Sequence, residues 1–331
     1  MAAFLPDALN LATALSCGVK SMPELHTKVI INPQAGSRSV GRQWPQINRQ
    51  LQKAGLSFDY EFTQGSGHAL DIASQAISSG YNYLIAVGGD GTVNEVANGI
   101  LRSANPLSVI LGTVSAGTAH AFAFSLGVTR DYRNSDDYSY LTRQRRVLID
   151  IGVVKCRNHG QSVERFFVNE ASVGLAAEIV DAWKPLPDRF GKYVNFAFRN
   201  IAGYKSLAAH RNKKVRLQIG DEVESISICT LVLSNGQYCA DRMLIAPHAR
   251  LDDGLLNAVV VGDVSRFEVL KIRPALYDGS HLKHPGIREI KTTAVTVESD
   301  EHLLVEADGE ILGECPASFR VIQSALNVVV P

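Results

Sequence analysis

The sequence predicts an α/β domain followed by an all-β sandwich. From Thr27 to about Val128 the chain alternates apolar strands with helical stretches, the pattern of a parallel sheet covered by helices. Beyond residue 146 the pattern changes to short alternating runs separated by Asp-Gly and Asn-Gly turns. We therefore assign residues 27–146 to the α/β domain and residues 147–331 to the sandwich. Residues 1–26 form an unassigned N-terminal extension.

Individual segments support this division. Trp44–Ala54 and His68–Ser79 have helical spacing, and Leu84–Val87 is a short apolar run that suits a strand buried on both faces of a parallel sheet. The strands expected in the sandwich are Val147–Val154, Phe166–Asn169, Val215–Ile219, Ile226–Leu233, Leu256–Val261, Thr293–Val297, Leu303–Glu306 and Phe319–Ile322.

Composition narrows the class of protein. The 331 residues are 46% hydrophobic and 20% charged, which is enough to bury one or two cores. The net charge is zero, so no basic excess indicates a nucleic-acid partner, and overall charge cannot drive attachment to anionic membranes. No apolar run could span a bilayer and residues 1–26 lack a signal-peptide pattern, so we expect a cytoplasmic protein. The five cysteines lack zinc spacing and are expected to be reduced thiols.

The most informative segment is the glycine turn Gly88–Gly91, which contains Asp90. It follows a buried strand and leads directly into an amphipathic helix. Three glycines in four positions let backbone N–H groups approach a polyanion that any Cβ would obstruct. The alternative, without any ligand, is that these glycines only make a tight turn between strand and helix. Neither a Walker A motif nor a Gly-x-Gly-x-x-Gly fingerprint is present.

The start of the following helix strengthens the phosphate-site interpretation. Thr92 and Glu95 have the spacing of a capping box, which places the helix N-terminus against the glycine turn. Such an end carries unpaired N–H donors and roughly half a positive charge, so it stabilises a bound phosphate. Because Asp90 would repel that phosphate, we infer a Mg²⁺ ion held by Asp90 directly or through water.

The chain resembles the diacylglycerol kinase catalytic-domain family, which includes bacterial diacylglycerol kinases, related lipid kinases and sphingosine kinases. The order and spacing of several motifs carry the resemblance over roughly residues 28 to 331. The matching segments are Val29–Gly36, Thr63 with Gly67–Ala69, Val87–Ile100, Gly117–Ala123, Asp253–Leu255 and Asp308–Glu310.

The resemblance implies an ATP- and Mg²⁺-dependent lipid kinase with an NAD kinase/diacylglycerol kinase-like α/β domain. It implies that the turn Asp308–Glu310 faces the nucleotide domain and that Asp308 or Glu310 takes the proton of the lipid hydroxyl, with Asp90 as a further candidate base. Without the resemblance, this turn would simply be an exposed hairpin. The implied nucleotide-binding residues are Asn32, Pro33, Gln34, Ala35, Gly36, Arg42, Thr63, Gly89, Asp90, Gly91, Thr92, Val93, Asn94, Glu95 and Thr118.

Further metal ligands are implied in the sandwich. Asp150 resembles the acid that joins a metal and water network between the domains of bacterial members, although it could be only a strand-end residue. A structural Mg²⁺ is implied at the Asp253 carboxylate with the backbone carbonyls of Arg250 and Leu255. Two departures from the family pattern concern the lipid substrate and catalysis. His120 stands where asparagine is usual and is followed by Ala121 in place of aspartate, and Ser37 stands where bacterial diacylglycerol kinases often have a lysine.

Arg189–Leu207 combines aromatic and basic residues and resembles a helix that docks to a lipid surface, although a core helix with a solvated basic face would look similar.

The expected partners are a membrane lipid substrate and, during turnover, the membrane surface, with no nucleic acid. The oligomeric state stays open, a homodimer included. Two other functions remain: a lipid-binding regulator with an inactive kinase fold, and an NAD kinase, which the opening Asn-Pro turn and the late Asp-Gly-Glu turn fit poorly.

Overall fold

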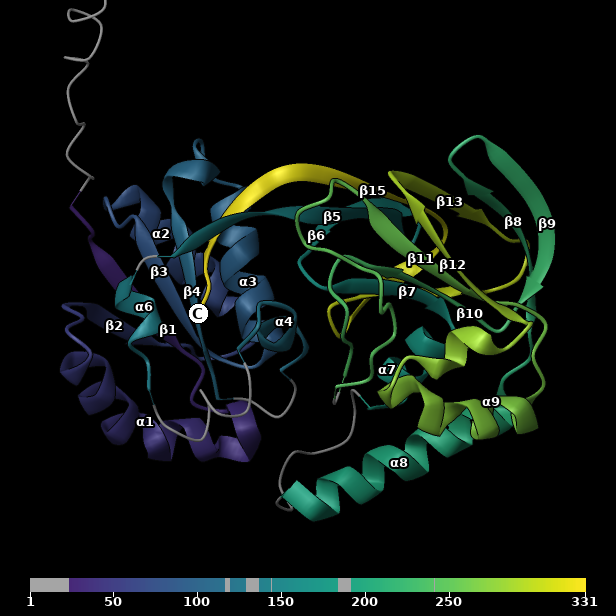
Figure 1. Cartoon of the computed structure of the whole chain (residues 1–331), viewed down its shortest axis with the longest axis horizontal. Helices are drawn as coiled ribbons and strands as arrows, with labels where there is room; N and C mark the ends of the chain where they lie inside the picture. The colour runs from purple at the N-terminus through teal and green to yellow at the C-terminus, as the bar shows by residue number, and fades with distance from the viewer. Residues whose placement is uncertain (1–23, 117–119, 129–136, 144, 184–191, 241) are drawn as a thin grey trace, which may run out of the picture.

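The computed structural model describes residues 24–116, 120–128, 137–143, 145–183, 192–240 and 242–331. Figure 1 shows two lobes, with the helices α1–α4 around one sheet and a β-rich lobe beside it. This arrangement confirms the predicted fold class of an α/β domain followed by a β-sandwich. The predicted extension lies almost entirely outside the described residues, as do Thr118 and most of the polar segment near residue 130.

Four parallel strands form the sheet of the α/β domain in the order β2-β1-β3-β4. A parallel sheet is buried on both faces, and β3 is accordingly buried at every position. The bounds of the strands are Thr27–Ile31 for β1, Asp59–Phe62 for β2, Tyr83–Gly88 for β3 and Ile110–Ser115 for β4.

Helices cover both faces of this sheet because successive strand residues point to opposite sides. On one face, Ile31 and Val87 pack with Trp44 of α1; on the other, Ile30 and Ala86 pack with α2 and α3. The bounds are Ala35–Lys53 for α1, His68–Ser78 for α2, Asp90–Leu101 for α3, Pro106–Ser108 for η1, Ala121–Ser125 for α4 and Tyr140–Arg143 for α6.

The sandwich encloses a second core between two layers of mostly antiparallel strands, with Phe167 and Phe319 among its largest buried side chains. One layer runs β12-β11-β10-β7-β14, and the other contains β9, β8, β13, β5 and β6. The bounds are Gln161–Phe167 for β6, Glu170–Gly174 for β7, Lys213–Ile219 for β8, Glu222–Ile228 for β9, Thr230–Ser234 for β10, Leu256–Val261 for β11, Ile287–Thr292 for β12, Ala294–Glu298 for β13 and Leu304–Ala307 for β14.

Two long antiparallel strands, β5 (Arg146–Asn158) and β15 (Glu310–Val329), connect the domains. The end of β15 leaves the sandwich and adds to the α/β sheet, where Asn327 pairs in parallel with Ile110 of β4. The last residues of β15 are therefore shared between the two domains. Because both strands are continuous, the relative position of the two domains is fixed by sheet hydrogen bonds.

The second domain carries helices beside its sandwich. It carries α7 (Leu175–Trp183), α8 (Lys192–Ala209), α9 (Arg266–Ile272), η2 (Arg273–Tyr277) and η3 (Ser280–Lys283). Figure 1 shows α8 and α9 together along the lower edge of this lobe. Length and hydropathy rule out a bilayer-spanning role for each helix in the part of the chain that the structure describes.

Candidate active site at the domain interface

The glycine turn lies at the carboxyl end of β3, and α3 begins at Asp90 with Gly89 as its N-cap. The predicted capping box is wrong, since no side chain caps α3. The Thr92 hydroxyl instead accepts a hydrogen bond from the Asn32 amide at 3.1 Å. The N-terminal N–H groups of α3 therefore have no side-chain acceptor of their own.

Glu95 caps a different helix. Its two carboxylate oxygens accept hydrogen bonds from the backbone N–H groups of Gly67, at 2.8 Å, and Ala69, at 3.0 Å. Gly67 is the N-cap of α2, so Glu95 satisfies two of the unpaired donors at the start of that helix. A residue that the sequence assigns to local capping thus fixes α2 against α3.

Gly88 and Gly91 lack side chains for different reasons. A Cβ at Gly88 would lie 2.4 Å from the Thr92 hydroxyl, so packing inside the protein excludes a side chain there. At Gly91 a Cβ would meet nothing within 4 Å, and the backbone does not adopt a left-handed conformation. Its missing side chain leaves the first turn of α3 open, which suits close approach of a phosphate group.

The Asp90 carboxylate accepts hydrogen bonds from the backbone N–H groups of Ala121, at 2.9 Å, and Phe122, at 3.2 Å. It thereby orders the start of α4. Burial raises the pKa of Asp90, and these two hydrogen bonds oppose that shift. A carboxylate offers about four lone-pair sites, so Asp90 retains acceptor capacity for a metal ion or its water. Ala121, a departure from the family pattern, contributes here through its backbone.

The other predicted nucleotide residues follow the carboxyl ends of neighbouring strands, the usual place for a ligand in such a sheet. The Asn32 and Thr63 N–H groups donate to Val87 and Ile31, and Gln34 donates to the Asn32 side chain at 3.0 Å. The structure therefore groups the turn Asn32–Gly36, Thr63 and the start of α3 at one edge. Arg42 is exposed on α1, and Thr118 lies outside the described residues.

Asp308 joins the two domains. It is buried in the hairpin between β14 and β15, and one carboxylate oxygen accepts from the Asn94 side chain on α3 at 2.6 Å and from the Val168 N–H at 2.7 Å. The other accepts from the N–H groups of Asn169, at 3.1 Å, and Glu170, at 3.0 Å. Burial raises its pKa to about 6, although these donors favour the ionised form.

Two further carboxyl groups lie beside Asp308 that the sequence analysis did not identify. Glu306 is buried on β14, and burial raises its pKa to about 7. It accepts hydrogen bonds from the Ser172 hydroxyl at 2.7 Å and from the Gly309 N–H at 2.5 Å. Glu170 starts β7; burial and then the charges of Glu306, Asp308 and Asp90 raise its pKa well above the ordinary value. Both occupy ordinary strand positions in the sequence, so no local signal indicates them.

The second acid of the turn, Glu310, is partly exposed and pairs with Arg165 at 3.3 Å. It lies at the start of β15, two residues beyond Asp308. With only one paired oxygen, its carboxylate keeps lone pairs open to an incoming group. In the predicted turn, the acceptor sites of the Asp308 carboxylate are therefore filled, and those of the Glu310 carboxylate are partly free.

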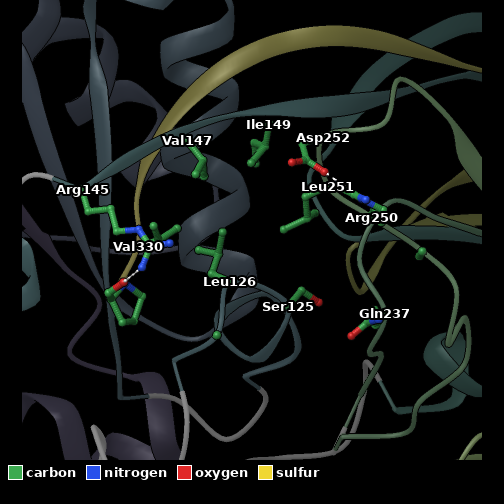
Figure 2. Close-up of a pocket in the computed structure, with 13 residues that line it drawn as sticks. Ser125, Leu126, Arg145, Val147, Ile149, Gln237, Arg250, Leu251, Asp252 and Val330 are labelled. Carbon is green, nitrogen blue, oxygen red and sulfur yellow. Dashed lines mark hydrogen bonds and ion pairs between the residues drawn. The ribbon is translucent and has the colours of Figure 1, made fainter.

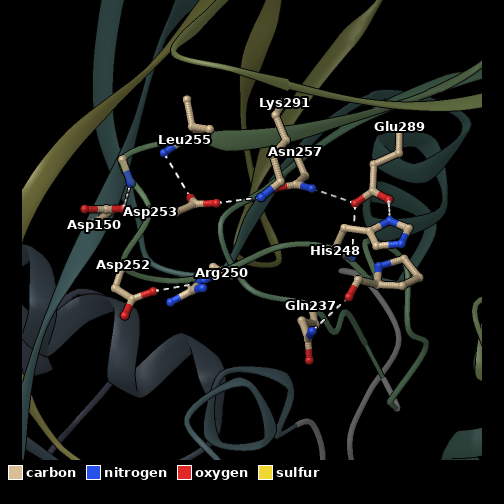
Figure 3. Close-up of polar contacts among 12 residues, drawn as sticks. Asp150, Gln237, His248, Arg250, Asp252, Asp253, Leu255, Asn257, Glu289 and Lys291 are labelled. Carbon is tan, nitrogen blue, oxygen red and sulfur yellow. Dashed lines mark hydrogen bonds and ion pairs between the residues drawn. The ribbon is translucent and has the colours of Figure 1, made fainter.

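Asp253, the side-chain ligand of the predicted structural Mg²⁺ site, makes other bonds (Figure 3). Asp253 pairs with the Lys291 ammonium at 2.7 Å and accepts from the Leu255 N–H at 3.2 Å, while Arg250 pairs with Asp252. The cation that balances Asp253 is therefore Lys291, and Mg²⁺ at this position stays a prediction. No group of three or more His, Cys, Asp or Glu side chains within the described ranges could hold a metal ion.

Asp150 helps to shape the interface through two backbone hydrogen bonds. Its carboxylate accepts from the backbone N–H groups of Gly254, at 2.6 Å, and Ser324, at 2.8 Å. Ser324 lies where the pairing of β15 with β5 is interrupted, and Gly254 belongs to the loop before β11. Asp150 thus holds a loop and a strand irregularity together, and a metal role for it stays a prediction.

An open pocket of about 470 Å³ lies between the domains (Figure 2). Leu126 and Val147 line it from the α/β side, and Gln237 and Leu251 line it from the sandwich. Ser125, also in its wall, lies 3.4 Å from the Asn169 side-chain oxygen, and the Asn169 N–H donates to Asp308. The pocket is therefore adjacent to the carboxylate cluster, and its lining combines apolar side chains with the charged side chains of Arg145, Arg250 and Asp252.

The raised pKa values of Glu306 and Asp308 predict how stability varies with pH. Both bind protons more tightly in the folded state than at their ordinary values of 4.5 and 3.8. Their contribution is therefore complete below the ordinary values of 3.8 and 4.5, and it is lost as the pH rises from there to about 6 for Asp308 and to about 7 for Glu306. We expect the unfolding free energy of the wild type to fall between these limits. That of Glu306→Gln should fall by about 2 kcal/mol less. Urea unfolding of both proteins at a series of pH values measures this difference. Unfolding free energies that change with pH in parallel in the wild type and the variant would contradict the prediction.

Comparison with known proteins agrees with this geometry. Residues 26–154 match the diacylglycerol kinase catalytic domain, and residues 172–330 match the YegS C-terminal NAD kinase beta sandwich-like domain. A diacylglycerol kinase of Staphylococcus carnosus is 28% identical over 305 residues, covering 92% of this chain and 94% of the relative.

Solved structures share the fold. A diacylglycerol kinase structure from Bacillus anthracis superposes with a TM-score of 0.68 at 18% identity, covering 94% of this chain and 98% of that one. Yeast NADH kinase reaches a TM-score of 0.50 at 8% identity, covering 93% and 84%. Together the two domain matches span both lobes, and the chain belongs to the diacylglycerol kinase catalytic-domain family.

Proposed function

We propose that this protein is an ATP- and Mg²⁺-dependent lipid kinase that transfers the γ-phosphoryl group to the hydroxyl of a membrane lipid alcohol, diacylglycerol-like or a sphingoid base. The observation that carries the proposal is the contact between Asp308 and Asn94 at 2.6 Å. It brings an acidic turn of the sandwich against the helix whose open first turn can receive a phosphate. Relatives named diacylglycerol kinase support this class of reaction.

In this proposal the open turn at Gly91 and the unpaired N–H groups of α3 bind the nucleotide phosphates. The edge formed by Asn32–Gly36 and Thr63 positions the rest of the nucleotide. Asp90 would hold Mg²⁺, which when bound neutralises charge on the transferred phosphoryl group. Asp90 also orders α4 through Ala121 and Phe122, so the metal-binding acid is itself held in place.

The two acids of the turn have different roles in this proposal. Asp308 already accepts four hydrogen bonds, which fill the acceptor sites of a carboxylate, so we assign it to positioning. Glu310 keeps free lone pairs and is our proton acceptor. As the lipid oxygen bonds to the γ-phosphorus, the bond from that phosphorus to the β,γ-bridging oxygen breaks, and the hydroxyl proton passes to Glu310.

The first test measures transfer from γ-labelled ATP to micelles of diacylglycerol, sphingosine and monoacylglycerol, with NAD as a soluble comparison. We expect label in a lipid and a fall of about a hundredfold or more in Asp90→Asn, because the amide removes the charge that holds Mg²⁺. The amide still offers an oxygen to α4, so melting temperature serves as the control. Labelled NAD would favour an NAD kinase, and ATP binding without transfer would favour a regulator.

The assignment of the proton acceptor is tested by comparing Glu310→Gln with Asp308→Asn. We expect Glu310→Gln to lower kcat by about a hundredfold with little change in KM for ATP, since it removes only the base. Asp308→Asn places an amide NH₂ among N–H donors, so we expect a loss of both activity and thermal stability. A Glu310→Gln enzyme with wild-type kcat would remove Glu310 from the mechanism.

We further propose that the apolar part of the pocket beside Ser125 receives part of the lipid acceptor. Val147→Phe would narrow this pocket, and we expect KM for the lipid to rise about fivefold or more, with KM for ATP unchanged. Leu148→Phe is the matched control, because Leu148 is exposed and neighbouring strand residues point to opposite faces. Equal lipid KM values in the two variants would exclude the pocket.

A further inference from the structure

The exposed apolar side chains of the second domain gather on its helices. Eleven large hydrophobic residues are exposed in the described part of the chain, and six of them lie on α8, α9 and η2. These six are Phe198, Ile201, Tyr204, Phe267, Leu270 and Tyr277. We propose that they form one docking surface for an anionic phospholipid bilayer, built from two helices and not from α8 alone.

Helix α8 has two distinct faces. Gly203 faces Ile179 and Trp183 of α7, and Leu207 is buried, so this side packs on the domain. Ile201 and Tyr204 lie on the outward side and are 52% and 47% exposed. An interfacial helix requires such an apolar outward face.

Helix α9 supplies the residue that the sequence analysis missed. Phe267 is 77% exposed, more than any other large hydrophobic residue described, and Leu270 follows three positions later on the same face. Val269 and Ile272 pack inward against the core of the domain. An aromatic ring held this far out of the core is suited to insertion among lipid headgroups.

Hydrogen bonds join the two helices into one surface. The Arg273 guanidinium donates to the Tyr204 hydroxyl and to the Asn200 side chain, each at 2.5 Å, and stacks over the Tyr204 ring. The Arg266 guanidinium donates to the Ala208 carbonyl. On the other side, the Trp183 indole donates to the Arg199 carbonyl at 2.8 Å, which fixes α8 to α7.

Charge identifies the partner. The segments α8, α9 and η2 contain six basic residues and one acid, Glu268, whereas the whole chain has no net charge. Lys205 and Lys271 are exposed and each lies four positions after an outward apolar residue, Ile201 and Phe267. A basic rim around exposed aromatic side chains matches the headgroup region of an anionic bilayer. This inference rests on the proposed function, which requires access to a bilayer-embedded alcohol.

Sedimentation with vesicles, without ATP, tests the surface directly. We expect the wild type to bind phosphatidylglycerol vesicles more strongly than phosphatidylcholine vesicles. Ile201→Ser/Phe267→Ser should weaken binding to both, and Lys205→Glu/Lys271→Glu should weaken phosphatidylglycerol binding about tenfold or more, because each cation near the surface contributes attraction. All four positions are exposed, so folding should be retained.

Matched controls change the same residue types elsewhere. Leu107→Ser/Val223→Ser removes two other exposed apolar side chains, and Lys53→Glu/Arg102→Glu reverses two exposed charges of the α/β domain. We expect both controls to bind vesicles like the wild type. Equal losses in the controls and the surface variants would overturn the proposal, as would a wild type that binds no vesicles, which would assign the surface to a protein partner.

Activity on detergent-dispersed lipid separates this proposal from the proposed function. The docking variants should keep their rate on micelles and lose it on vesicles. Vesicle binding without transfer to any lipid would retain the docking surface and overturn the kinase. Transfer to micelles with unaltered vesicle binding by both variants would retain the kinase and overturn the surface.

Discussion

The buried carboxylate of Asp308 is the interaction on which the geometry of the interface depends. A carboxylate out of contact with water is costly unless donors replace the water, and here four N–H groups do so. Three belong to the segment Val168–Glu170 of the same domain, and the fourth is the Asn94 side chain on α3. The fourth bond forms only when the two domains are together, so domain position and ionisation of Asp308 are coupled.

The same principle operates along α3, whose acids stabilise helices other than their own. Asp90 accepts the first N–H groups of α4, and Glu95 accepts those of α2. These acids therefore leave the N-terminus of α3 without a side-chain cap. In our proposal this matters for function, because the first turn of α3, which Gly91 keeps open, is then free of a competing side-chain acceptor and can receive an anion.

Much of this could be predicted from the sequence, because strand periodicity, the glycine turn and the order of the motifs are local properties. The capping box failed because the true partners of Glu95, Gly67 and Ala69, lie 28 and 26 residues away, where no spacing rule applies. Glu170 and Glu306 escaped notice because a strand acid looks solvent-exposed until its neighbours are known. Phe267 was missed for a similar reason, since α9 meets α8 only in the folded chain.

The structure also explains how a protein without net charge can have a basic docking surface close to an acidic site. The two are separated by β7, which starts at Glu170 beside Asp308 and ends at Gly174, a length of about 17 Å. Helix α7 starts at the next residue and supports α8 through Trp183. In our proposal, the orientation in which this surface meets a bilayer sets the height of the site above the bilayer, because the Trp183 contact holds α8 against α7. Lipid access then depends on how deeply Phe267 and its neighbours insert, which is a geometric property that charge alone does not set.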